Sequence, residues 1–286
     1  VGGRYRGNSN LFGNKMGGFV TGGVTEGMNN GPDGSLIRDH YVHSIAADTW
    51  TGSERLVVNC HVDDVDPGSS GAHPDFFQSH AVEPDWCHDV ILYNVSGWGC
   101  KSQGLFGWRL KDAAFVNIVF HLEGGSFTSQ FSGDLDNVLF AHITLVDQTW
   151  NWREGFAPKD VRSINGVYGN MIVYGPDVMK TDGSTGLTVD HNAFYGKKSK
   201  TSAAESDWGS NDVAIGREFT DEANHDYSLV DGSAGLENGI PLQCVPTDLN
   251  GNPYPTGARP CGAYTTPALA TRPAKVWADN WEQGGD

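Results

Sequence analysis

The sequence predicts an all-β protein: a right-handed parallel β-helix (a single-stranded β-solenoid) with a loop-rich C-terminal covering segment. Three observations predict this fold. Glycine accounts for 38 of 286 residues, about twice its ordinary usage, while only 19% of residues are charged. Short β-branched runs recur through the middle of the chain, and no helical period separates them. Each run carries an Asn or His at the same place, as the stacked turns of a solenoid would.

That recurring Asn or His sets the repeat. Runs such as LVVNCHV, ILYNVS and LFAHITL align on it at intervals of 21 to 35 residues. Because stacked amides and imidazoles satisfy backbone groups at turns, we expect this column to be structural rather than catalytic. Its expected members are Asn59, Asn94, His121, His142, Asn170 and His191.

One domain is expected over residues 1–286. Residues 1–50 should hold irregular first turns, 51–196 the regular turns, 197–240 a long polar loop with the last turn, and 241–286 the covering segment. A cover across the end of the coil would protect exposed strand edges. Cys244 and Cys261 flank a Pro/Gly/Asn-rich stretch of this segment, where a loop-closing disulfide is expected. Because disulfides persist in oxidising compartments, we expect an exported protein, extracellular or periplasmic.

The charge balance and the apolar pattern limit the classes of binding partner that we expect. Nineteen basic and thirty-five acidic side chains give a net charge of −16, a field that repels nucleic acid. No apolar stretch approaches the length of a membrane span. The five cysteines show no CxxC spacing that would indicate structural zinc. Neither nucleic acid nor a membrane is therefore expected as a partner.

A second strand follows each Asn or His, and it predicts one polar face. If seven residues within PGSSGAH form a loop, Asp75 falls nine residues after its anchor, as Gln103, Gln130 and Asn151 do. Period-two alternation then puts Phe76, Gly104, Phe131 and Trp152 inside the coil. The predicted outer face carries His73, Asp75, Phe77, Lys101, Gln103, Leu105, Gln130, Asn151 and Arg153.

This face could support β-elimination on a uronate-containing glycan. His73 and Asp75 lie two apart on one strand, roughly 6.6 Å along the backbone. Elimination needs a cation or donors to neutralise the carboxylate, a base for the sugar C5 proton and an acid for the leaving oxygen. The expected catalytic residues are His73, Asp75, Lys101 and Arg153, and Gln103, Gln130 and Asn151 are expected to bind substrate.

Hydrolysis on the same fold is the alternative, since it needs two carboxylates that flank the bond. Asp48, Asp75 and Glu154 are its candidates, although Glu154 falls on the interior phase. The lyase is preferred because the face offers basic and amide groups more readily than paired acids.

Two further features bear on ligands. Asp63, Asp64 and Asp66 cluster at a strand-to-loop junction, where calcium is a candidate ligand, and no other cofactor is required. Trp98 and Trp108 lie near glycine-rich turns and are candidates for stacking on sugar rings, whereas Trp150 is expected in the core.

The runs DYSLVDGSAGLENGIP and DLNGNPYPTGARPCGAY resemble the closing segment of secreted right-handed parallel β-helix proteins of the pectate-lyase-like superfamily. Tyr254 stands where a basic residue is more usual. The superfamily includes polysaccharide lyases, glycoside hydrolases and phage tailspikes, and the resemblance implies a secreted protein that acts on a polysaccharide. A non-catalytic glycan-binding or tailspike-like module is the remaining alternative. A monomer is favoured, and a trimer is expected if the protein is tailspike-like.

Overall fold

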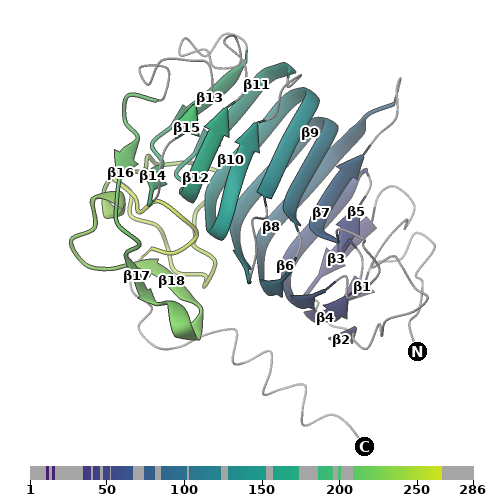
Figure 1. Ribbon diagram of the computed structural model, residues 1–286, viewed down its shortest axis with the longest axis horizontal. Coiled ribbons are helices and arrows are strands. Elements are labelled where there is room, and N and C mark those ends of the chain that lie inside the picture. The colour runs from purple at the N-terminus through teal and green to yellow at the C-terminus, as the bar shows by residue number, and fades with distance from the viewer. Residues whose placement is uncertain are drawn as a thin grey trace, which may run out of the picture.

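The strands form one long parallel coil. The computed structural model describes residues 11–12, 15–16, 35–39, 41–45, 48–51, 53–66, 74–80, 85–101, 103–123, 128–152, 157–173, 186–195, 199–200 and 209–265. Within these residues sixteen strands belong to one sheet, and every pairing among its strands is parallel. Figure 1 shows them side by side from the purple N-terminal strands to the green β16. The predicted all-β parallel solenoid is confirmed; its right-handed sense stays a prediction.

The bounds of the elements follow the turns of the coil. The N-terminal strands are β1 (Leu11–Phe12), β2 (Lys15–Met16), β3 (Ser35–Arg38), β4 (Tyr41–Ile45) and β5 (Trp50–Thr51). The central strands are β6 (Arg55–Val65), β7 (Asp75–His80), β8 (Cys87–Cys100), β9 (Gln103–Leu122), β10 (Thr128–Trp152), β11 (Ala157–Ile164) and β12 (Val167–Val173). The last strands of the coil are β13 (Leu187–Asp190), β14 (Ala193–Phe194), β15 (Ser199–Lys200) and β16 (Val213–Ala214). A separate antiparallel pair, β17 (Phe219–Asp221) and β18 (Asp226–Leu229), flanks the 3₁₀ turn η2 (Glu222–Asn224), and η3 (Ala234–Leu236) follows.

The core is a set of columns in which like positions of successive turns stack. One column is set by the strand registers and contains only residues that are at most 2% exposed: Val57, Leu92, Phe115, Phe140, Ser163 and Val189. Large rings fill the interior between columns; Phe76 stacks on Phe120 with centroids 4.0 Å apart. Trp150 is fully buried, as predicted. Burial of these apolar columns is the main favourable term that holds the coil together.

Corners of the coil are made by residues with positive φ. Asn59, Asn94, Asn117, His142, Asn165 and His191 form one such column, with φ between 51° and 58°. Asn tolerates this left-handed conformation better than most residues, which explains its recurrence at the corner. The amides also bond from turn to turn: Asn94 Nδ2 donates to Asn59 Oδ1 (3.2 Å), and Asn117 Nδ2 donates to Asn94 Oδ1 (3.0 Å).

The prediction of this column was wrong for two residues, His121 and Asn170. His121 hydrogen-bonds Asp147 instead, and Asn170 is in register with Thr149. Their corner places belong to Asn117 and Asn165. The prediction failed there because the strands on both sides of this corner are rich in β-branched residues. An Asn or His within either strand therefore has the same sequence surroundings as a corner residue.

The described part of the C-terminal segment, from residue 238 to residue 265, lies along the flank of the coil. Backbone carbonyls of this segment accept hydrogen bonds from the corner column in four different turns. The pairs are Thr247 with Asn117 (2.7 Å), Gly262 with His142 (3.0 Å), Ile240 with Asn165 (2.9 Å) and Asn238 with His191 (2.8 Å). Val245 and Tyr254 add apolar contacts over Val116 and Ala141. The segment thus satisfies corner groups that would otherwise face solvent or each other.

The expected disulfide between Cys244 and Cys261 is wrong, because both residues are free thiols. Cys261 is buried, and its thiol donates to the His191 carbonyl at 3.2 Å. Burial raises the pKa of this thiol to about 12. Cys244 is exposed to solvent whereas Cys261 is buried, so the two thiols lie in different environments.

Candidate functional site

The predicted site centres on a corner where Asp75 begins β7. Asp75 is in register with Gln103 of β9, which confirms the predicted alignment of these two positions across the loop. Asp48 approaches from the preceding turn, and its Oδ1 accepts a hydrogen bond of 3.0 Å from the Asp75 backbone N–H. The Thr49 N–H in turn donates to the Asp75 carbonyl at 2.8 Å. Two carboxyl groups from neighbouring turns are therefore held at one corner.

The Asp75 side chain has an unusual environment. It is 0% exposed, and its Oδ2 accepts a hydrogen bond of 3.2 Å from Gln78 Nε2. Its Oδ1 has no hydrogen-bond partner among the described residues. Burial, and then the negative charge of Asp48, raise the pKa of Asp75 to about 9, against the smaller lowering effect of Gln78. Asp75 is therefore a neutral carboxylic acid at pH 7.

The predicted division between outer and inner face holds only in part. Phe76, Gly104, Phe131 and Trp152 are buried as expected, but Asp75, Phe77 and Leu105 are fully buried too. Strict alternation fails at this corner, where the consecutive residues Phe76 and Phe77 are both buried. Phe77 packs edge-on against Phe115 across the interior, with centroids 5.2 Å apart. Among the described residues, Asp75, Phe77 and Leu105 therefore do not belong to the open polar face that alternation predicted.

The amides and the lysine occupy different places from those expected. Gln130 is in register with Phe106 rather than with Gln103, and it is only 8% exposed. Lys101 is exposed at the corresponding corner of the turn that follows Asp75. Its Nζ lies 2.7 Å from Asp66 Oδ2. The ion pair with Asp66 raises the pKa of the Lys101 ammonium. Its charge is thus already matched by a carboxylate.

An aromatic strip lies on the outer face of the same sheet. Trp108 is 41% exposed, and Phe106 precedes it by two residues on the same face of β9. Gln78 and Gln130 are in register with Phe106 on the two neighbouring strands. We call Gln78, Phe106, Trp108 and Gln130 the aromatic strip. Amphipathic rings flanked by amides suit the apolar faces and hydroxyls of a sugar.

Two members of this strip were missed from the sequence. Gln78 ends the run HPDFFQ, and Phe106 lies in KSQGLFG. A register shift of three residues between Gln103 and Gln130 hides the strip, because it brings Gln130 beside Phe106. The period-two spacing of Phe106 and Trp108 was the available signal.

A second polar cluster, absent from the sequence-based expectations, lies under the β17–β18 pair. The Tyr227 hydroxyl hydrogen-bonds His121 Nδ1 (2.6 Å), and His121 Nε2 donates to Asp147 Oδ2 (3.1 Å). Arg217 then holds Asp147 with two bonds of 2.5 and 2.8 Å and also pairs with Glu222. We call His61, Trp98, His121, Asp147, Arg217, Glu222, His225 and Tyr227 the histidine cluster.

Trp98 belongs to this cluster rather than to a free sugar platform. The His225 ring stacks on it with centroids 4.7 Å apart and planes 4° apart. His225 Nδ1 hydrogen-bonds the Tyr227 hydroxyl (3.0 Å), and burial, then the neighbouring His121, lower the pKa of His225. His61 also tilts against Trp98, at a centroid distance of 4.7 Å. One face of the indole is therefore occupied by an imidazole.

The three aspartates considered for calcium lie in different surroundings. Asp63 accepts a hydrogen bond of 2.9 Å from His61 Nε2, and Asp66 pairs with Lys101. Asp64 is an exposed corner residue with a φ of 56°. Within the described chain, these three do not form one of the clusters whose ligand atoms converge.

Several predicted site residues lie outside the described residues: His73, Arg153 and Glu154, together with the predicted loop at 67–73. Asn151 lies in β10, where its backbone is in register with Ile172. The structure therefore brings together Asp48, Asp75 and Gln103, with Lys101 at the next turn of their corner.

Comparison with known proteins gives no family assignment. No protein-family model matches the chain, and no curated protein matches it. In the described part of the chain, no helix has both the length and the apolar character needed to cross a membrane.

Proposed function

We propose that the protein is a secreted polysaccharide-degrading enzyme that uses the neutral carboxyl group of Asp75 as its general acid. The observation that carries this proposal is the buried Asp75 carboxyl, whose pKa is raised to about 9, beside Asp48, which accepts a hydrogen bond from the Asp75 backbone N–H at the same corner. A carboxyl group whose pKa is raised by burial, with a second carboxylate beside it, is a common arrangement for acid and base roles. The parallel solenoid and the resemblance of the C-terminal runs to the pectate-lyase-like superfamily agree with this class.

The aromatic strip supplies the binding surface in this proposal. Trp108 offers an exposed indole face, and the amides of Gln78 and Gln130 lie beside Phe106 on either side. A glycan chain along this face would cross the strands and pass the corner that holds Asp75. Stacking would bind the sugar rings, and the partly exposed amide of Gln78 would orient the hydroxyls.

In the proposed reaction Asp75 donates its proton to the glycosidic oxygen as the bond from that oxygen to the sugar carbon breaks. The Asp48 carboxylate accepts a proton from water, and the hydroxide equivalent completes the sugar. An acid of raised pKa can contribute about 10² to 10⁴ to the rate. Because Asp75 is covered in this structure, the reaction requires its carboxyl to be uncovered toward the substrate.

We favour hydrolysis over β-elimination, which reverses the preference drawn from the sequence. Elimination needs a cation or hydrogen-bond donors for the uronate carboxylate, and the cation predicted for this role at the Asp75 corner, the Lys101 ammonium, is already paired with Asp66. A carboxylate near Asp75 instead supplies the second group that hydrolysis needs. Elimination is kept as the second candidate because Lys101 lies at the next turn of the same corner.

The first experiment incubates the protein with a panel of neutral and acidic polysaccharides, with and without calcium, and follows reducing ends beside the ultraviolet absorbance of unsaturated products. Reducing ends without absorbance support hydrolysis. Reducing ends with absorbance support the lyase, and attention then moves to Lys101 and His73. Binding without either signal would reject the enzyme and favour a glycan-binding module, for which a trimer in solution would indicate the tailspike-like class.

A further inference from the structure

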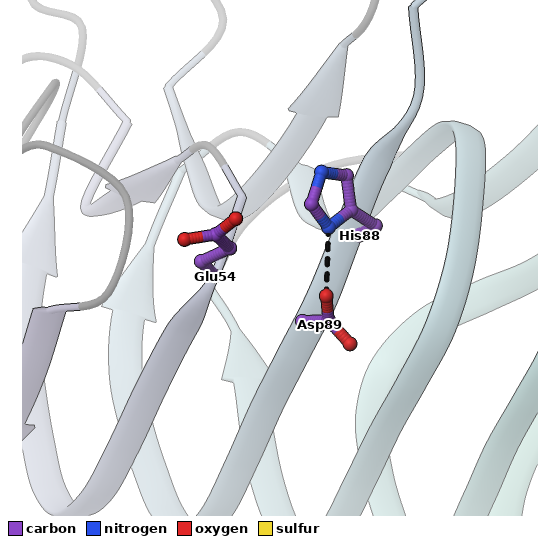
Figure 2. Close-up of side chains that lie close together, drawn as sticks. All are labelled: Glu54, His88 and Asp89. Atoms are coloured by element: carbon purple, nitrogen blue, oxygen red, sulfur yellow. Dashed lines mark hydrogen bonds and ion pairs between the residues drawn. The ribbon is translucent and has the colours of Figure 1, made fainter.

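A second group of potential ligands lies at a different corner of the coil. Glu54, His88 and Asp89 each offer one ligand atom, and these atoms all lie within 4.8 Å of one another. Figure 2 shows the Glu54 carboxylate, just before the start of β6, facing the His88–Asp89 pair on the neighbouring strand β8. His88 Nδ1 lies 2.8 Å from Asp89 Oδ2. The three side chains thus come from two adjacent turns and converge at the surface.

The backbone holds these ligands in place. The Glu54 N–H donates to the His88 carbonyl at 2.6 Å, and the His88 N–H donates to Ser53 Oγ at 3.2 Å. Glu54 and Asp89 are corner residues with φ values of 50° and 54°. Asp is common in this left-handed conformation, whereas Glu is not among the residues enriched there. Both turns are therefore tied together at the point where the side chains meet.

Among the described residues, no basic side chain neutralises the charge of this group. Within the described chain, neither Glu54 nor Asp89 forms an ion pair with a lysine or arginine, although Lys111 is in register with His88. A second convergent group, His121, Asp147 and Glu222, differs in this respect. The Arg217 guanidinium pairs with both of its carboxylates and so takes the place that a cation would occupy.

We propose that Glu54, His88 and Asp89 bind one divalent transition-metal ion of the zinc class. The ion replaces the hydrogen bond between His88 and Asp89, with Nδ1 of the neutral imidazole and one oxygen of each carboxylate as ligands. An imidazole nitrogen with two carboxylates suits Zn²⁺ and its neighbours, whereas Ca²⁺ prefers oxygen ligands alone. Water fills the open positions, since His88 and Asp89 are partly exposed. The bound ion links two turns of the coil.

The test measures Zn²⁺ binding by calorimetry, with a thermal-unfolding scan on the same samples. A Cys244→Ser background is used because that exposed thiol could bind zinc itself. We expect one ion per chain and a higher Tm with zinc. Glu54→Gln and His88→Gln should each weaken the affinity at least tenfold and abolish the rise in Tm. Ca²⁺ should bind at least tenfold more weakly at this group.

Asp112→Asn is the matched control, because Asp112 is a corner residue of the next turn and is not part of the group. Its zinc affinity should equal that of the background protein. Co²⁺ provides a spectroscopic check, with visible absorption bands that His88→Gln removes. Absence of zinc binding, zinc binding that both substitutions leave intact, or equal affinity for calcium would each overturn the proposal. None of these results depends on whether the protein cleaves glycans.

Discussion

The Asp75 corner and the histidine cluster both place titratable groups against the coil, yet they differ in how those groups are paired. In the histidine cluster the polar groups form one connected chain of hydrogen bonds, from His225 through Tyr227 and His121 to Asp147. At the Asp75 corner, Oδ1 of a fully buried carboxyl has no hydrogen-bond partner among the described residues. The first arrangement uses its polar groups to hold β17–β18 on the coil. The second leaves one group whose burial carries a cost, as is usual where chemistry takes place.

The largest effect should come from Asp75→Asn. If the Asp75 corner is catalytic, glycan cleavage should fall by about 10² to 10⁴, because the amide cannot supply the proton. His121→Gln is the control in the other region and should leave turnover within a few-fold of the original. Initial rates at equal concentrations of folded protein measure both. Equal loss in the two variants would contradict the functional division between the regions.

The pH dependence of stability should separate the regions next. The folded-state pKa of Asp75, about 9, lies above its usual value of 3.8. Between these two values the folded protein holds a proton that the unfolded chain releases, so Asp75 lowers stability as pH rises, by up to about 1.4 kcal/mol per pH unit. Asp75→Asn should therefore gain stability over the original protein progressively from about pH 4 to pH 9. Urea unfolding at several pH values measures this, and a constant difference would refute a neutral Asp75.

A smaller effect is expected from Tyr227→Phe, which removes one hydroxyl from the histidine cluster. His121 Nδ1 and His225 Nδ1 each lose their hydrogen bond to the hydroxyl, so the free energy of unfolding should fall by about 1–3 kcal/mol. Glycan cleavage at a temperature well below unfolding should not change. Equilibrium unfolding in urea measures the first quantity. An unchanged midpoint would mean that water replaces the hydroxyl without loss.

The smallest effect concerns the two tryptophans. Trp108→Ala should weaken glycan binding by about tenfold, equivalent to about 1.4 kcal/mol, with little change in stability. Trp98→Ala should lower stability with little change in glycan binding, because its indole packs on His225 and His61. Affinity electrophoresis in glycan-containing gels, beside thermal unfolding, compares them. If both variants lose affinity equally, the aromatic strip is not the binding face.

The fold could be predicted from the sequence because its signal repeats. Glycine-punctuated β-branched runs and a recurrent Asn or His indicate stacked turns, and four of the six predicted corner residues occupy the corner. The alignment of Asp75 with Gln103 also followed from counting residues. Exposure could not be predicted in the same way. Alternation presumes a straight strand, and it fails at the corner where Phe76 and Phe77 are both buried.

The histidine cluster was missed for a different reason. His121 and Tyr227 are 106 residues apart, and they meet only because the β17–β18 pair lies on the flank of the coil. No periodic pattern encodes that contact. The group at Glu54 and His88 was hidden similarly, since its members lie at a corner shared by adjacent turns rather than in one motif.

The flank segment has a consequence for how the chain acquires its structure. In an ordinary solenoid each turn contacts only its neighbours, so turns can form one after another. Here carbonyls from residues 238–262 complete the hydrogen bonding of corners at Asn117, His142, Asn165 and His191. A ribosome-bound chain would therefore carry incomplete corners through most of its synthesis. Full cooperativity would arrive only when the last part of the described chain emerges and ties distant turns into one unit.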